Sequence, residues 1–241
     1  MLYNKRIAGC WDLFIGWNRR LQTEGVWLNR LIGRFGIRSV LDVAAGTGFH
    51  AITLAKRGYS VEAWDVSTPM LSAARRNAAA LGVAVKLKRR SWLSAKTPGA
   101  NKTYDCVLCL GNSYAHLLTP SRRRRALLMW CSLLNPAGIL VLDVRNFDGM
   151  SRSRRSQIPF SYHGPAVVDI LSTSATRVDL KYSVAGCQFR LSYANLSPQN
   201  IRDEARACGF EVVKTYGNGR GRFKIEEVSF YQLVLRKHPR Q

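Results

Sequence analysis

Residues 39–50, SVLDVAAGTGFH, constrain the fold more than any other stretch of this chain. The run VLDV at 40–43 is typical of a buried parallel strand, and it breaks into Gly46-Thr47-Gly48 before a helical pattern begins near Phe49. Glycine permits a tight turn and lets the backbone approach a ligand closely, and the first N–H groups of the following helix are unpaired. The pattern predicts a strand-turn-helix unit with a nucleotide-type ligand site.

The turn is compatible with two kinds of nucleotide ligand. Residues 46–51 fit the dinucleotide fingerprint G-x-G-x-x-A, and Asp65 follows at the spacing of a ribose-binding acid. Asp42 favours S-adenosylmethionine instead, because a carboxylate at the end of the strand repels a pyrophosphate and attracts an α-ammonium group. A turn that binds no ligand is the third interpretation.

The length and composition predict one globular core. With 241 residues, 46% of them hydrophobic, the chain can bury a substantial core and a small appended subdomain. No apolar stretch is long enough for a membrane span, and the first residues lack the order of a signal peptide. We therefore expect a cytoplasmic protein.

The six cysteines are scattered, and several lie in apolar runs where a free thiol behaves as a small hydrophobic group. No disulfide framework is expected. The one C-x-x-C, Cys106 to Cys109, falls in a predicted strand, where positions three apart point to opposite faces and cannot hold one metal ion. We expect no metal site.

The charge is unusual for a globular enzyme. Lysine and arginine number 37 against 15 acidic residues, a formal net charge of +22 that would attract nucleic acid or anionic ligands. The basic residues are spread along the chain without one aromatic-interleaved segment. A solvated basic surface is therefore favoured over nucleic-acid binding, which stays open.

Residues 1–38 predict two amphipathic helices. Trp11, Phe14 or Ile15, and Asn18 follow a 3.6-residue period, and a second apolar face follows at 26–32. Such a helical lid can lie over the mouth of the sheet, with Trp11 facing the cofactor or serving as a core aromatic.

The next elements complete a βαβαβ half, in which Asp65 closes the second strand. A carboxylate at that position can accept both ribose hydroxyls of an adenosine. The expected elements are helix 49–57 ending at Gly58, strand 60–64, helix 68–81 opened by Thr68 as N-cap and Pro69, and a strand near 83–87.

Polar residues also follow the fourth and fifth predicted strands, 104–110 and 138–144. Ligands of open α/β sheets bind beyond the carboxyl ends of the strands, so Asn112 would face the cleft, unless it is a turn asparagine in the left-handed region. Arg145 offers a planar fork for a carboxylate, unless it pairs with Asp143 or Asp148.

The remaining elements bring the sheet to seven strands. They are a turn at 135–138 after helix 121–134, helix 198–208, and strands 210–216 and 230–236. Residues 151–196 alternate as short antiparallel strands and are expected to form a cap insertion. The fold class is α/β, a mostly parallel sheet with helices on both faces and a small antiparallel cap.

Several co-ordered segments resemble the glycine and glycine/sarcosine N-methyltransferases, and D-x-A-x-G-T-G looks like motif I of class I methyltransferases. The resemblance runs from about Tyr3 to Arg236 and implies a Rossmann-like fold, S-adenosylmethionine as cofactor, and N-methylation of a small amino acid. The segments are WDLFIGWNRRLQTEGVWL, VLDVAAGTGFH, CLGNSYAHL, LDVRNFD, FRLSY and GFEVVKTYG.

The resemblance also implies site residues. Asn112 and Arg145 would hold the substrate carboxylate, with Tyr162, Tyr182 and Tyr193 around the sulfonium and the substrate. The implied cofactor contacts are Tyr3, Trp11, Arg20, Asp42, Ala44, Gly46, Gly48, Asp65, Val66, Met70, Ser91, Trp92, Leu110, Gly111 and His116.

One departure concerns adenine. The family has an Asp-Trp pair after the third strand, where this chain has Arg89-Arg90-Ser91-Trp92. The expected domains are a helical lid at residues 1–38 and the methyltransferase domain at 39–241.

Two alternative functions stay open. The chain could be a methyltransferase for an amine-bearing natural product or for RNA, or a non-catalytic nucleic-acid-binding protein on the same fold. Gly111-Asn112-Ser113-Tyr114 is not the N/D-P-P-Y/F of base methyltransferases.

Overall fold

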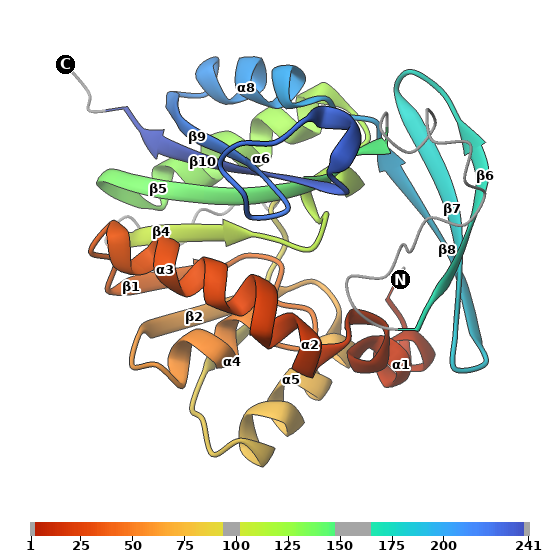
Figure 1. Cartoon of the computed structure of the whole chain (residues 1–241). Coiled ribbons are helices and arrows are strands. Elements are labelled where there is room, and N and C mark those ends of the chain that lie inside the picture. Colours follow the sequence, from red (N-terminus) through yellow and green to blue (C-terminus); the bar gives the residue numbers. More distant parts are fainter. Residues whose placement is uncertain (1–2, 94–101, 148–164, 239–241) are drawn as a thin grey trace. The chain divides into compact units, whose positions relative to one another are not determined.

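The computed structural model describes residues 3–93, 102–147 and 165–238. Its main sheet has seven strands in the order β3-β2-β1-β4-β5-β10-β9, and a smaller sheet has the order β6-β7-β8 (Figure 1). β10 runs antiparallel to β5 and β9, whereas the pairs β1–β2, β2–β3 and β4–β5 are parallel. The predicted α/β class with a mostly parallel seven-stranded sheet is confirmed.

The described residues divide into two compact units. The first unit consists of residues 3–91, 165–173 and 179–191, and the second of 92–93, 102–147, 174–178 and 192–238. No helix in these described ranges is both long and apolar enough to cross a membrane.

The first unit contains the predicted βαβαβ half. Its strands are β1 (Ser39–Asp42), β2 (Ser60–Asp65) and β3 (Lys86–Arg89), and its helices are α4 (Phe49–Ala55) and α5 (Thr68–Ala80). Register places Asp65 beside Arg89 at the carboxyl ends of their strands. The predicted order of strand, helix, strand, helix and strand is confirmed.

Two boundaries in this unit were predicted wrongly. Ser67, not Thr68, is the N-cap of α5, because its hydroxyl accepts a hydrogen bond from the Met70 N–H at 3.2 Å. The third strand begins at Lys86 rather than near Val83, because the Val83 N–H is still bound to the Ala78 carbonyl at the end of α5.

The N-terminal segment is more broken than the predicted pair of helices. It consists of α1 (Lys5–Ile15), α2 (Trp17–Arg20), a π-helical turn (Leu21–Gly25) and α3 (Val26–Arg34). Gly16 adopts φ +61° and ends α1, so the predicted run from Trp11 to Asn18 does not lie on one helix.

The small sheet consists of β6 (Val167–Thr173), β7 (Arg177–Val184) and β8 (Cys187–Ala194), which confirms the short strands predicted between 151 and 196. In the first unit its aromatic side chains pack against α1. The ring of Phe14 lies 5.3 Å from Tyr182 and 5.9 Å from Phe189, which buries the apolar face of that helix.

The second unit holds the other four strands of the main sheet. They are β4 (Tyr104–Cys109), β5 (Leu134–Arg145), β9 (Phe210–Gly217) and β10 (Phe230–Lys237), with helices α6 (Pro120–Ser132) and α8 (Pro198–Arg206). Cys106 and Cys109 are buried in β4, the strand in which the sequence placed them.

The turn predicted at 135–138 is instead an irregularity inside β5. Tyr104 pairs with Leu134 but Cys106 pairs with Ile139, so the ladder skips residues between these pairs. Ala137 has φ +59° there, and a Cβ on Gly138 would lie 3.0 Å from the Asn135 carbonyl. A bulge lets the strand continue past a proline and an asparagine that usually end one.

Candidate functional site

The glycine turn after β1 has the geometry that its sequence predicts. Gly46 and Gly48 have φ of +54° and +93°. A Cβ on Gly48 would lie 2.7 Å from Ile52 Cδ1, whereas a Cβ on Gly46 would meet only Trp11 Nε1, at 3.5 Å. The lack of a side chain at Gly48 therefore leaves room for Ile52 of α4. At Gly46 it leaves the backbone open beside the indole of Trp11.

Asp42 is fully buried at the end of β1. Its Oδ1 accepts the Ala44 N–H at 3.1 Å, while Oδ2 is buried without a hydrogen-bond partner among the described residues. Burial raises the pKa of this carboxyl above its ordinary value. A buried acceptor of this kind fits a cationic donor such as the ammonium of S-adenosylmethionine.

Asp65, at the end of β2, accepts hydrogen bonds from the backbone of the same turn and of the loop after β2. Its Oδ2 accepts the Gly46 N–H at 2.9 Å and its Oδ1 accepts the Ser67 N–H at 2.8 Å. Burial raises the pKa of Asp65, although these two hydrogen bonds oppose that effect. Each carboxylate oxygen has a second lone pair, so the group can still accept ribose hydroxyls.

Tyr3 and Trp11 lie near this turn. Their rings form an edge-to-face pair with centroids 5.2 Å apart, and the Tyr3 carbonyl accepts the Ser67 hydroxyl at 2.6 Å. Trp11 also packs against Phe14, at 4.7 Å. The core-aromatic interpretation of Trp11 is therefore confirmed, and its indole also lies beside Gly46; its contact with the cofactor stays a prediction.

Arg20 is held at the first turn of α4 by a partner that the sequence did not reveal. Its guanidinium bonds Glu24 at 2.6 and 2.9 Å, contacts His50 Nε2 at 3.2 Å and lies 4.6 Å from the centroid of Phe49. His50 Nε2 is also 2.6 Å from Glu24. Burial raises the pKa of Glu24, but the charges of Arg20 and His50 outweigh it and hold that pKa below its ordinary value.

In the second unit, Asn112 joins the ends of β4 and β5. It has φ +58°, as the turn-asparagine interpretation predicted, and its backbone N–H donates to Asp143 at 2.6 Å. Its Oδ1 accepts the Arg145 N–H at 2.9 Å, whereas its Nδ2 is buried without a hydrogen-bond partner among the described residues. The amide N–H₂ is therefore a donor available to a ligand.

Arg145 is buried at the end of β5, and its guanidinium lies 4.3 Å from the centroid of the Phe230 ring. The aromatic face supports the planar cation and limits its orientations. Arg145 and Asn112 thus place two kinds of donor at one edge of the sheet, which can recognise a carboxylate.

His116 follows Asn112 closely in the chain and ends the short helix Tyr114–His116. Its ring is 4.7 Å from that of Tyr193, and Phe147 lies 5.8 Å from Tyr193. Burial lowers the pKa of His116 to about 4, although a hydrogen bond to the Ser192 backbone opposes this effect. The imidazole is therefore neutral near pH 7.

The predicted site residues thus fall into two groups. Tyr162 lies outside the described residues. The first unit holds Tyr3, Trp11, Arg20, Asp42, Ala44, Gly46, Gly48, Asp65, Val66, Met70, Ser91 and Tyr182, and the second holds Trp92, Leu110, Gly111, Asn112, His116, Arg145 and Tyr193.

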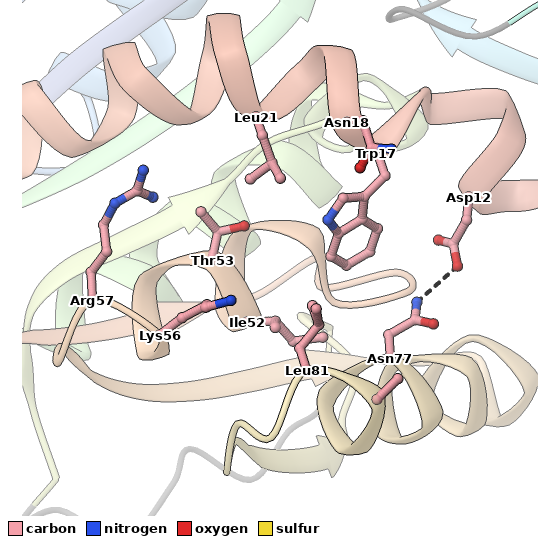
Figure 2. A pocket seen from close by; sticks show the side chains of 11 residues that line it. Asp12, Trp17, Asn18, Leu21, Ile52, Thr53, Lys56, Arg57, Asn77 and Leu81 are labelled. Atoms are coloured by element: carbon pink, nitrogen blue, oxygen red, sulfur yellow. Dashed lines mark hydrogen bonds between the residues drawn. The ribbon is translucent and has the colours of Figure 1, made fainter.

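A separate cavity of about 720 Å³ lies in the first unit between the N-terminal helices, α4 and α5 (Figure 2). Trp17, Leu21 and Ile52 form apolar walls, and Asp12 Oδ2 accepts a hydrogen bond from Asn77 at 2.8 Å. None of the predicted site residues lines this cavity, but Asn77 in its wall donates to the Thr47 carbonyl of the glycine turn at 3.0 Å.

The fold and the glycine turn indicate the class of protein. Residues 40–138 match the family model described as a methyltransferase domain. The structure is similar to an S-adenosylmethionine-dependent methyltransferase from Clostridium acetobutylicum, with a TM-score of 0.74 and 13% identity over 88% of this chain and 89% of the other. The fold is that of the class I S-adenosylmethionine-dependent methyltransferases.

Sequence comparison narrows the class to a family. The chain is 43% identical over 237 residues to a glycine/sarcosine N-methyltransferase from Parasynechococcus marenigrum, covering 95% of this chain and 82% of the relative. It is 31% identical over 240 residues to one from Halorhodospira halochloris, covering 96% and 87%. The chain belongs to the glycine/sarcosine N-methyltransferase family, which confirms the resemblance found in the sequence.

Proposed function

We propose that this chain transfers a methyl group from S-adenosylmethionine to the amine nitrogen of a small amino acid, glycine or sarcosine. The observation that carries the choice of a carboxylate-bearing substrate is the buried amide N–H₂ of Asn112, which has no hydrogen-bond partner in the described part of the chain and whose Oδ1 accepts the Arg145 N–H. The names of both relatives support the same substrates.

The first unit contains the side chains that would bind the cofactor. Asp42 would accept the α-ammonium, Asp65 the ribose hydroxyls, and Trp11 would cover the open backbone at Gly46. Arg20, held by Glu24, would lie near the methionine carboxylate. Bound S-adenosylmethionine supplies an electrophilic methyl carbon on a positively charged sulfur.

On the substrate side, Arg145 and Asn112 would donate to the carboxylate. Fixing the carboxylate also fixes the amine, which is separated from it by a single carbon in glycine. Such alignment lowers a displacement barrier by up to about 7–11 kcal/mol in favourable models. Tyr162, Tyr182 and Tyr193 are proposed to accept from the amine.

No strong base is required, because a neutral amine attacks directly and its extra proton leaves to solvent. We do not assign the role of general base to His50 or His116.

Residues 1–38 and 151–196 are proposed as the lid and the cap. We infer a cytoplasmic location, with which the lack of a disulfide among the described residues is consistent.

The test is methyl transfer from labelled S-adenosylmethionine to a panel of glycine, sarcosine, amines without a carboxylate, and RNA. We expect label in glycine or sarcosine and little in methylamine or dimethylamine. Label found only in RNA or in an amine without a carboxylate would overturn the proposal.

A further inference from the structure

Two cysteines far apart in the sequence meet in the first unit. Cys10 lies on α1 and Cys187 begins β8, and their thiols lie at neighbouring carbonyls of α1: Cys10 Sγ is 3.3 Å from the Ile7 carbonyl and Cys187 Sγ is 3.8 Å from the Arg6 carbonyl. Arg6, one helical turn before Cys10, fixes this contact from two sides. Its guanidinium donates to the Gly186 carbonyl at 3.0 Å, and its own carbonyl is the one beside Cys187.

The two thiols differ in their surroundings. Cys10 is buried and donates to the Ile7 carbonyl at 3.3 Å, and burial, together with its contact to Cys187, raises its pKa to about 11. Cys187 is partly exposed. An oxidant in solution therefore reaches Cys187 first, and Cys10 is the neighbouring thiol that can resolve the product.

We propose that Cys10 and Cys187 form an oxidation site that closes to an intramolecular disulfide when the chain meets hydrogen peroxide. The Cys187 thiolate attacks one peroxide oxygen, the O–O bond breaks, and a sulfenic acid and hydroxide form. The Cys10 sulfur then displaces the hydroxyl group from Cys187, and its proton leaves with that oxygen as water. Two thiols and one peroxide thus give one disulfide and two waters.

The bond would tie α1 to β8. Trp11 follows Cys10 directly, and its indole lies over the glycine turn at Gly46. Oxidation would therefore fix the helix that carries this indole. The proposed disulfide does not depend on which amine accepts the methyl group.

The experiment treats the full chain with hydrogen peroxide, alkylates the remaining thiols and maps the peptides. We expect the loss of two of the six thiols, a peptide pair joined through Cys10 and Cys187, and full recovery with dithiothreitol. In the Cys10→Ser chain, Cys187 should stop as a sulfenic acid that dimedone traps. In the Cys187→Ser chain, Cys10 should stay reduced.

Cys131 and Cys208 provide the matched control, because they are the second pair of neighbouring cysteines in the described residues and Cys131 is also partly exposed. The Cys131→Ser chain should form the Cys10–Cys187 bond at the wild-type rate. Circular dichroism checks that each variant folds. The proposal is overturned if Cys10 and Cys187 remain alkylatable while Cys131 is oxidised, or if Cys10 oxidises equally fast without Cys187.

Discussion

At the scale of single residues, the site keeps two carboxylates where folding alone disfavours them. Asp42 and Asp65 end neighbouring strands, and burial raises the pKa of each. Two backbone N–H groups offset part of this cost for Asp65, but one oxygen of Asp42 has no hydrogen-bond partner among the residues that the structure describes. A group that is costly to the empty protein gains its stabilisation from a ligand.

Asp42→Asn is therefore expected to raise or preserve the melting temperature while it weakens S-adenosylmethionine binding. At neutral pH the folded state bears the cost of the buried charge, and the amide removes it while its oxygen can still accept the Ala44 N–H. Loss of a charge-assisted bond costs about 1.5–3 kcal/mol, roughly a ten- to hundredfold rise in Kd. Calorimetry and thermal unfolding measure both effects.

Asp12→Asn is the matched control, because Asp12 also has a buried oxygen without a hydrogen-bond partner in the described ranges and is not one of the proposed cofactor contacts. Its Kd should equal that of the wild type. Equal affinities for the wild type and Asp42→Asn would remove the proposed role of Asp42.

His116 predicts a pH dependence of stability. Its folded pKa of about 4 lies below the ordinary value of 6.5, so the unfolded chain binds the proton more tightly and stability falls as pH drops through this window. The expected loss between pH 7 and pH 5 is about 2 kcal/mol. Urea unfolding of His116→Phe should show this part of the dependence removed, and an identical pH profile would contradict it.

At the scale of elements, glycines and caps decide where helices begin. Gly48 combines a left-handed φ of +93° with a close approach to Ile52, whereas Gly58 has φ +88° with nothing within 4 Å of an added Cβ. The two positions therefore separate backbone strain from crowding.

Gly48→Ala is expected to destabilise the chain more than Gly58→Ala. An alanine in the left-handed region destabilises the folded state by about 1–2 kcal/mol at either position, but only Gly48→Ala also forces Ile52 to move. Thermal unfolding of the two variants gives the comparison. Equal melting temperatures would show that crowding at Gly48 has no effect.

The same local signals explain what could be predicted from the sequence. Ser197-Pro198 opens α8, where Asn200 completes a capping box, and the glycine turn with Asp42 and Asp65 was found from the residues alone. The π-helical turn and Glu24 were not predicted, because the contact of Glu24 with His50 joins residues far apart in the chain. The path of β5 through Asn135-Pro136 was missed for a similar reason, since pairing across the sheet outweighs local turn propensity.

At the scale of the whole molecule, the charge of +22 remains the feature that the proposed function does not need. Four consecutive arginines lie on α6, and three of them, Arg122, Arg124 and Arg125, are exposed. Arg123 differs, because it is buried and bonds Glu204 on α8 at 2.7 and 2.9 Å. The run is therefore partly structural.

Binding of RNA is expected to be weak and non-specific. Its affinity should fall linearly with the logarithm of salt concentration, because counterion release drives it. Fluorescence anisotropy with several RNA sequences at increasing salt tests this. Sequence-selective binding at physiological salt, followed by methylation of the bound RNA, would favour the RNA alternative.

The most direct test of the central claim is the ratio of methylation rates for glycine and methylamine, measured for the wild type, Arg145→Ala and Arg145→Lys. Charge-assisted hydrogen bonds contribute about 1.5–3 kcal/mol, so Arg145→Ala should lower kcat/KM for glycine roughly ten- to a hundredfold and leave methylamine nearly unchanged. Lysine should rescue only part, since a point charge cannot donate as a planar fork. Arg125→Ala, an exposed arginine on α6, should keep the wild-type ratio. A glycine-to-methylamine ratio that is unchanged in Arg145→Ala, whatever its melting temperature, would contradict recognition of an amino acid through its carboxylate.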